Sequence, residues 1–285
     1  MIDKTELYID GAWVKSIDGK VIPVINPATE EGYASITLAG KADTETAIAV
    51  AKRTFPTWSM TSPEERLEYL KKILAVYQSR ELEMAQVISE EMGAPIDLAI
   101  SEQASSGSSH LKAFIRTLAA FEWVRPLRPG TAGQDLTYEP AGVAALITPW
   151  NWPMNQVALK VGAAIAAGCT MVLKPSEIAP MSGMLFADMI HEAGLPAGVF
   201  NMINGDGVGA GSIMSSHPDI DVVSFTGSTR AGILITKAAA DSVKNVSLEL
   251  GGKSPNLIFD DCDIDAAVTR GTKFCFNNTG QSCNA

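Results

Sequence analysis

The chain has 285 residues, of which 46% are hydrophobic and 19% are charged. This length and composition are typical of a folded globular protein of about two domains, and they exclude a disordered chain. Lys and Arg number 22 against 32 Asp and Glu, which gives a formal net charge of −10. Because an acidic chain repels phosphate backbones, we expect no nucleic-acid partner.

Membrane, export and metal signals are not evident in the sequence. Its longest run without charged or strongly polar residues, 161–173, is far shorter than the roughly 20 residues that span a bilayer. The first residues, MIDKTELYIDGAW, carry acids where a signal peptide has a basic and then an apolar run. The four cysteines lack metal-ligand spacing. We therefore expect no membrane partner, no metal, reduced thiols and a cytoplasmic location.

Short strands are predicted for the first forty residues. Asp10 and Gly11 lie between alternating apolar runs, which indicates a hairpin, and Asp18 with Gly19 repeats that signal. A further hairpin predicted at 122–140 is rich in Pro and Gly, and it is expected to leave the main body.

Helices are predicted between these two regions. Ser62 and Pro63 have the residue types of an N-cap and a first helical position. Apolar residues recur at helical spacing after them, and a second helical pattern continues to about residue 123.

From residue 142 the sequence alternates between apolar strands and helices. Strands are predicted at 144–150, 170–175, 198–204, 222–227 and 246–250, with helices at 155–168, 180–194, 208–217 and 228–240. Two helices are expected to end at Gly168 and Gly194. This alternation predicts an α/β fold, a doubly wound and mostly parallel sheet with helices on both faces.

Two glycine-rich turns are candidates for phosphate binding. Gly227 and Ser228 open a helix after a strand, where free backbone N–H groups suit an anion, although a tight strand-to-helix turn explains the same residues. Residues 205–211 fit a loose dinucleotide template. The next strand ends without an acid, which argues against an ordinary dinucleotide phosphate loop there.

Polar side chains follow two of the predicted strands. Lys174 and Glu177 lie at a strand end, where an acid can accept the hydroxyls of an adenosine ribose; a solvated loop pair is the alternative. Asn151 also follows a strand, and its amide can donate to a developing oxyanion or cap a helix.

A carboxylate and a thiol complete the candidates. Glu249 faces away from Leu248 and Leu250, so it is either a general base or an exposed strand glutamate. Cys283 is a potential nucleophile, which needs nearby N–H donors or a cation to form its thiolate. Buried packing residues are the expected role of Cys169, Cys262 and Cys275.

Five motifs, taken together, resemble the aldehyde dehydrogenase family. They are TPWNWPMNQ, LKPSE, FTGSTRAG, LELGGKSPN and NNTGQSCNA, in this order and at these separations. EEMGAP and VINPATEE resemble the same family, so the similarity extends from the first hairpin to the last residue.

The resemblance implies a role for each candidate catalytic residue. Cys283 corresponds to the nucleophile that attacks an aldehyde to form a thiohemiacetal and then a thioester. Asn151, with the backbone N–H of Cys283, corresponds to the oxyanion site. Glu249 corresponds to the base that activates water to release a carboxylic acid.

The resemblance also implies a nicotinamide cofactor. NAD is expected rather than NADP, because Glu177 would repel a 2′-phosphate, although Lys174 and Ser176 would partly compensate. Ten residues match cofactor-contacting positions: Trp150, Lys174, Ser176, Glu177, Gly207, Gly211, Gly227, Ser228, Gly232 and Leu250.

The domain division implied by the resemblance has three parts. Residues 1–121 and 141–251 would form a Rossmann-like dinucleotide-binding domain, 122–140 a bridging hairpin for oligomerisation, and 252–285 the beginning of an α/β catalytic domain. Family members are considerably longer, so the sequence is expected to be their N-terminal part, and the complete enzyme a homodimer or homotetramer.

Two other functions stay open beside the oxidation of an aldehyde to an acid. The chain could be a nucleotide-binding module without turnover, because much of the expected catalytic domain lies outside it. An acylating dehydrogenase that forms acyl-CoA is less favoured, because such enzymes usually lack the glutamate found at Glu249.

Overall fold

The computed structural model describes residues 1–130 and 133–284. The strands are β1 Ile2–Lys4, β2 Glu6–Ile9, β3 Ala12–Lys15, β4 Lys20–Asn26, β5 Glu31–Leu38, β6 Val124–Pro126, β7 Asp135–Thr137, β8 Val143–Ile147, β9 Thr170–Lys174, β10 Phe200–Met202, β11 Val222–Gly227 and β12 Asn245–Leu250. The helices are α1 Lys41–Trp58, α2 Pro63–Ser79, α3 Glu81–Met92, α4 Ile96–Leu98, α5 Ser105–Ala120, α6 Pro153–Ala167, α7 Met181–Glu192, α8 Ser212–Ser216, α9 Thr229–Ala240 and α10 Ile264–Phe276. Two π-helical segments, η1 Ala99–Ala104 and η2 Gly207–Gly211, and the short 3₁₀ segment η3 Asn277–Gly280 complete the list.

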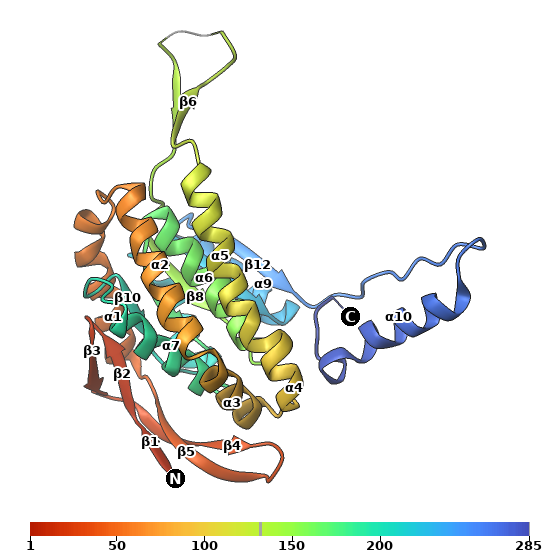
Figure 1. Cartoon of the computed structure of the whole chain (residues 1–285). Helices are drawn as coiled ribbons and strands as arrows, with labels where there is room; N and C mark the ends of the chain where they lie inside the picture. Colours follow the sequence, from red (N-terminus) through yellow and green to blue (C-terminus); the bar gives the residue numbers. More distant parts are fainter. Residues whose placement is uncertain (131–132, 285) are drawn as a thin grey trace.

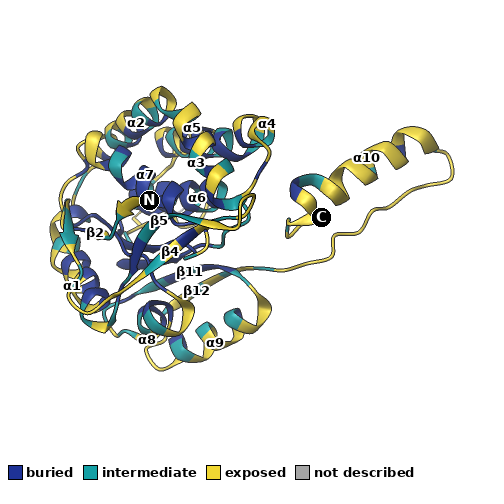
Figure 2. Ribbon diagram, turned by 90° about the horizontal axis from the view of Figure 1, so that it is seen from below, coloured by how far each residue is buried: buried dark blue, intermediate teal, exposed yellow. Residues whose placement is uncertain are grey.

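A seven-stranded sheet forms the centre of the molecule, in the order β12-β11-β8-β9-β10-β2-β3. The strands from β12 to β10 run parallel, and the β2–β3 hairpin is added antiparallel at one edge. Helices cover both faces of this sheet (Figures 1 and 2). The predicted α/β class and mostly parallel sheet are therefore confirmed.

The two faces of the sheet have separate hydrophobic cores. In β8, Leu146 packs with the core that α2, α3, α5, α6 and α7 share, whereas Ala145 and Ile147 face the core beside α1 and α8. In β9, Leu173 likewise packs in the first of these cores and Val172 in the second. This alternation is the period of two of a strand that is buried on both sides.

Of the two hairpins predicted in the first forty residues, one is confirmed and the other is wrong. Asp10 and Gly11 turn the chain between β2 and β3 with φ of 57° and 76°. The chain does not turn back at Gly19, because β3 stays in the large sheet while β4 pairs with β5 in a separate three-stranded sheet. The Asp18 carboxylate instead accepts from the backbone N–H of Ala42 (2.9 Å) at the start of α1, so it caps a helix.

The helix boundaries largely follow the sequence signals. The Ser62 hydroxyl accepts from the backbone N–H of Glu65 and caps α2, with Pro63 as first residue, as predicted. Gly168 is the left-handed C-cap of α6, also as predicted. The helix expected to end at Gly194 ends at Glu192, two residues earlier. Gly194 still has a φ of 73°, so it turns the chain just after the helix.

Two segments project from the body in Figure 1. The first is the hairpin of β6 and β7, which pair antiparallel as predicted for 122–140; its residues 131 and 132 lie outside the described chain. The second is residues 251–284, here called the arm, with α10 at its centre; most of its side chains are exposed (Figure 2). Across the described chain, no helix is both long and apolar enough to cross a membrane.

Candidate active site

The Asn151 and Cys283 segments meet around one pocket with a volume of about 360 Å³. It lies at the carboxyl ends of the parallel strands β8, β11 and β12, where open α/β sheets bind ligands. Six of the sequence-predicted residues line it: Trp150, Asn151, Gly227, Ser228, Leu250 and Cys283. The lining also contains Pro149, Trp152, Gln156, Thr226, Gly251, Gly252, Lys253, Gly280, Gln281 and Ser282.

Direct hydrogen bonds hold the two segments together. The Asn151 side-chain amide donates to the backbone carbonyl of Gln281 (2.7 Å), and the Trp152 indole donates to the hydroxyl of Ser282 (2.8 Å). A Cβ at Gly252 would lie 3.1 Å from the Cys283 backbone carbonyl oxygen, a tight contact that would require a small shift of the chain. These contacts place the segment that carries Cys283 beside the Asn151 loop.

The start of α9 lies at this pocket. Ser228 caps the helix, because its hydroxyl accepts from the backbone N–H of Ala231 (3.2 Å). The remaining free N–H groups of the first turn and the helix dipole favour a negatively charged ligand. Gly232 plays a different part, since a Cβ there would lie 2.8 Å from the Leu250 side chain. It allows α9 to pack closely on β12 and is not among the lining residues.

A second group of predicted cofactor residues gathers around Lys174, at the end of β9. The Lys174 ammonium is buried, donates to the carbonyl of Gly205 (2.6 Å) and lies 3.6 Å from the Glu177 carboxylate. Burial lowers the pKa of Lys174, and the charges of Glu177 and Asp206 oppose that shift. A Cβ at Gly211 would sit 3.9 Å from the Lys174 side chain.

The other two residues of this group differ in exposure. Ser176 is buried, and its hydroxyl accepts from the backbone N–H of Ile178 (3.3 Å). Gly207 is exposed, with open space where a Cβ would be. The structure thus brings Lys174, Glu177 and Gly211 together, beside an open glycine turn.

Glu249 is exposed on β12, with its neighbours Leu248 and Leu250 half-buried. The predicted alternation of faces is therefore correct. Glu249 is not among the described residues that line the Cys283 pocket. Its carboxylate instead acts electrostatically on Lys160.

Lys160 is a buried cation that the sequence analysis did not single out. Its ammonium donates to the hydroxyl of Ser224 (2.8 Å) between α6 and β11. Burial lowers the pKa of Lys160 to about 8, and the negative charge of Glu249 opposes that shift. The sequence does contain a signal for a buried charge, because Lys160 is the one charged residue in the apolar helix predicted at 155–168. The buried amides Gln103 and Asn278 were missed as well, and only tertiary contacts reveal them.

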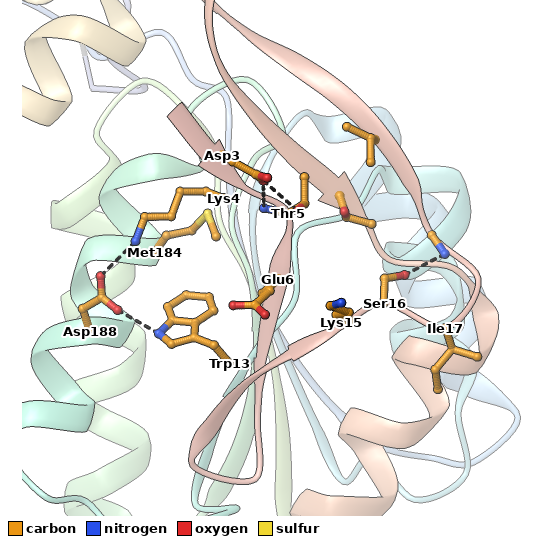
Figure 3. Close-up of a pocket in the computed structure, with 13 residues that line it drawn as sticks. Asp3, Lys4, Thr5, Glu6, Trp13, Lys15, Ser16, Ile17, Met184 and Asp188 are labelled. Carbon is orange, nitrogen blue, oxygen red and sulfur yellow. Dashed lines mark hydrogen bonds and ion pairs between the residues drawn. The ribbon is translucent and has the colours of Figure 1, made fainter. Parts of the chain in front are cut away.

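A larger pocket, of about 650 Å³, lies beside the N-terminal strands (Figure 3). Its charged groups are partly satisfied by each other. The Asp188 carboxylate accepts from the Trp13 indole (2.8 Å) and from the Lys4 ammonium (3.4 Å). Its described lining holds none of the sequence-predicted site residues. Within the described chain, no group of three or more His, Cys, Asp or Glu side chains could hold a metal ion.

Comparison with known proteins agrees with the geometry. Residues 13–285 match the model of the aldehyde dehydrogenase family. The chain is 50% identical to a 3-succinoylsemialdehyde-pyridine dehydrogenase from Pseudomonas, over all of this chain and 59% of that protein. The chain therefore belongs to the aldehyde dehydrogenase family, and it spans about three-fifths of the length of that relative.

Solved structures show the same fold. An aldehyde dehydrogenase from Bartonella henselae superposes with a TM-score of 0.98 at 54% identity, covering all of this chain and 60% of that one. A mutant of aldehyde dehydrogenase C from Pseudomonas syringae, in complex with NAD⁺ and octanal, gives 0.95 at 46% identity, covering 98% of this chain and 57% of that one.

Proposed function

We propose that the protein oxidises an aldehyde to a carboxylic acid with NAD⁺, through a thioester on Cys283. The observation that carries this proposal is the single pocket that holds Asn151, Cys283 and the N-terminus of α9. A nucleophile, an amide donor and an anion-binding helix end are the groups that this reaction requires.

The chain's own residues account for the covalent steps. The Cys283 sulfur bonds to the aldehyde carbon, and the Asn151 amide stabilises the negative oxygen of the thiohemiacetal. One N–H of that amide bonds to Gln281, and the other has no partner within the described chain. After two-electron oxidation to the thioester, Glu249 accepts a proton from water, whose oxygen attacks the carbonyl carbon and releases the acid and the Cys283 thiolate.

The two groups of predicted cofactor residues suit a dinucleotide. NAD⁺, when bound, accepts the two electrons that the aldehyde loses. The free N–H groups at the start of α9 suit its pyrophosphate, and the strand-end pair Lys174 and Glu177 suits its adenosine ribose. Glu177 disfavours the 2′-phosphate of NADP, and the structural relative with bound NAD⁺ supports the same preference.

Replacing the thiol tests the proposal. Cys283→Ala in the intact gene product is expected to abolish aldehyde-dependent NADH formation, because it removes the nucleophile. The matched control is Cys275→Ala. Cys275 was predicted to be a buried packing residue, but it is exposed, because α10 buries only Ala267 among its residues. Turnover retained in Cys283→Ala would refute the assignment.

Nucleotide binding without turnover is the second candidate. It is favoured by the position of Glu249, which is exposed and is not among the described residues that line the Cys283 pocket. Isothermal titration of the 285-residue chain with NAD⁺, beside an assay with a panel of aldehydes, separates the two functions. Binding with no NADH formed would support the second, and robust NADH formation would exclude it.

We further propose the division of the chain that its motifs imply. The body, residues 1–121 and 141–251, would bind the dinucleotide, and residues 252–285 would begin a catalytic domain. The projecting β6–β7 hairpin would join subunits in a homodimer or homotetramer. Sedimentation of the intact gene product with and without residues 124–137 tests that role.

A further inference from the structure

Three side-chain amides form a connected network beneath the candidate active site. The Gln103 side-chain nitrogen donates to the backbone carbonyl oxygen of Asn151 (3.1 Å) and to the side-chain oxygen of Asn278 (3.3 Å). The Asn278 side-chain nitrogen donates to the backbone carbonyl oxygens of Asn151 (2.9 Å) and Gln281 (3.2 Å). The Asn151 amide also donates to Gln281, so all four residues are linked.

The two buried amides of this network, Gln103 and Asn278, use all of their N–H donors. An amide nitrogen carries two hydrogens, and Gln103 and Asn278 each donate both of them. Gln103 is 0% and Asn278 is 6% exposed. Because a buried donor without an acceptor is costly, each bond resists being broken alone.

The loop before the thiol needs such support. Asn278, Thr279 and Gly280 have φ of 50°, 55° and 73°, so three successive residues adopt the left-handed conformation. Glycine and asparagine tolerate it, but for a β-branched residue such as Thr279 it is strained. Such a conformation persists only where its surroundings hold it, and the bonds of Asn278 do so here.

Gln103 connects the loop to the body of the molecule. It lies in the π-helical segment η1, between the fully buried Ala99 and Ala104. Segments of this kind occur often at functional sites. Neither the Asn151 loop nor the loop at Asn278 belongs to this element. Gln103 therefore holds both loops by hydrogen bonds from a third, buried element.

We propose that Gln103 and Asn278 are positioning residues, which set the Asn151 amide relative to Cys283 for the oxyanion of the aldehyde. This inference rests on the proposed function. Neither side chain lines the pocket, so each acts through the backbone of Asn151 and Gln281. The network determines where the free N–H of the Asn151 amide points, and therefore the rate of the chemical step.

The test uses substitutions that remove the donors in the intact gene product. Gln103→Leu removes the buried amide, and Asn278→Gly removes it while keeping the left-handed backbone. We expect kcat to fall about 10- to 100-fold, because misplacing a catalytic group by about 1 Å costs up to 10²-fold. The KM for NAD⁺ is expected to stay within about threefold, since the loss concerns the transition state.

A neighbouring asparagine provides the matched control. Asn277 donates to the Glu102 carboxylate of the same η1 segment (3.0 Å) but to neither Asn151 nor Gln281. Asn277→Gly is therefore expected to keep kcat within about threefold. Equal losses in Asn277→Gly and Asn278→Gly would overturn the proposal, because loop flexibility alone would explain both.

A double-mutant cycle separates positioning from general destabilisation. In an Asn151→Ala background, Gln103→Leu is expected to lower kcat by less than about threefold further, because the group it positions is gone. Fully multiplicative losses would overturn the proposal. If Gln103→Leu fails to fold, Gln103→Met, which is closer to glutamine in shape and also lacks the amide, takes its place in the cycle.

A measurement that needs no turnover keeps this proposal distinct from the proposed function. Alkylation of Cys283 by iodoacetamide, read by mass spectrometry, is expected to change at least threefold in Asn278→Gly and to stay unchanged in Asn277→Gly. Equal alkylation rates would overturn the inference even if Cys283→Ala abolished turnover. Conversely, turnover retained in Cys283→Ala would refute the function, while the alkylation difference would still show that Asn278 places the thiol.

Discussion

The body of the molecule and the arm are built in different ways. In the body, alternate residues of the central strands enter two hydrophobic cores, and side chains such as Phe186 are completely buried. In the arm, α10 leaves Ile264, Val268 and Phe274 more than half exposed. Hydrophobic burial therefore fixes the strand β8 that Asn151 follows, whereas hydrogen bonds to the body hold the segment of Cys283.

This difference shows that the candidate site is assembled from two kinds of support. Asn151, the proposed oxyanion donor, follows β8 and shares the stability of the sheet, which is expected to approach the global free energy of unfolding. The thiol lies at the end of a segment with few buried apolar contacts, which is typical of a low-stability region. Substitutions in the two regions should therefore differ sharply in their effects.

The largest contrast is expected between two phenylalanines. Phe186→Ala removes a side chain that is 0% exposed and packs edge-on against Tyr77, so it should lower the free energy of unfolding by about 3–5 kcal/mol. Phe274 is 62% exposed, and Phe274→Ala should change that free energy by less than about 0.5 kcal/mol. Urea unfolding followed by circular dichroism measures both. Equal losses would show that the arm is packed as tightly as the body.

The next contrast concerns buried and exposed charge. With a pKa of about 8, Lys160 loses its proton more easily in the folded chain than in the unfolded chain. Between pH 8 and about pH 10.4 the unfolded state binds more protons, so the free energy of unfolding should rise with pH. Lys160→Met should remove up to about 3 kcal/mol of that rise.

The matched control for that experiment is Lys273→Met, on the exposed surface of α10. Its urea midpoints from pH 7 to pH 10 should follow those of the parent chain. If the free energy of unfolding depended on pH in the same way in the parent chain and in Lys160→Met, that result would contradict the burial of this ammonium.

Local sequence signals predicted the sheet better than its edges. Apolar runs and glycine C-caps such as Gly168 located the strands and helices of the parallel sheet, because each signal acts within a few residues. The turn at Asp18 and Gly19 was wrong for the opposite reason. Asp18 bonds to the start of α1, twenty-four residues later, and no local pattern reveals such a contact.

The candidate site shows the same limit. Asn151 and Cys283 were found from their residue types and the motifs around them, and the structure brings them to one pocket. Gln103 and Asn278 are ordinary polar residues in the sequence, and they gain meaning only when η1 and the loop at Asn278 meet. Lys160 was also missed, although a charged residue in an apolar helix is visible without coordinates.

A smaller contrast is expected at two helix N-caps. Ser62→Ala removes the cap of α2 in the body and should lower the free energy of global unfolding by about 1 kcal/mol. Asp263→Ala removes the cap of α10, where the side chain accepts from Ala266. It should leave global unfolding unchanged and speed amide hydrogen exchange within α10. A shift of the global transition by Asp263→Ala would mean that body and arm unfold together.

The smallest effect is expected at the junction between the two regions. Trp152→Phe keeps an aromatic ring but lacks the indole N–H, so it loses the hydrogen bond to Ser282, worth about 0.5–1.5 kcal/mol. Ser282→Ala loses the same hydrogen bond by removing its acceptor. Both should raise the rate of limited proteolysis within residues 251–284 by a similar factor while the body stays intact. The double variant should be no faster than either single variant, because both remove one interaction. Unchanged cleavage would show that the other bonds, among them that from Asn151 to Gln281, hold the arm without it.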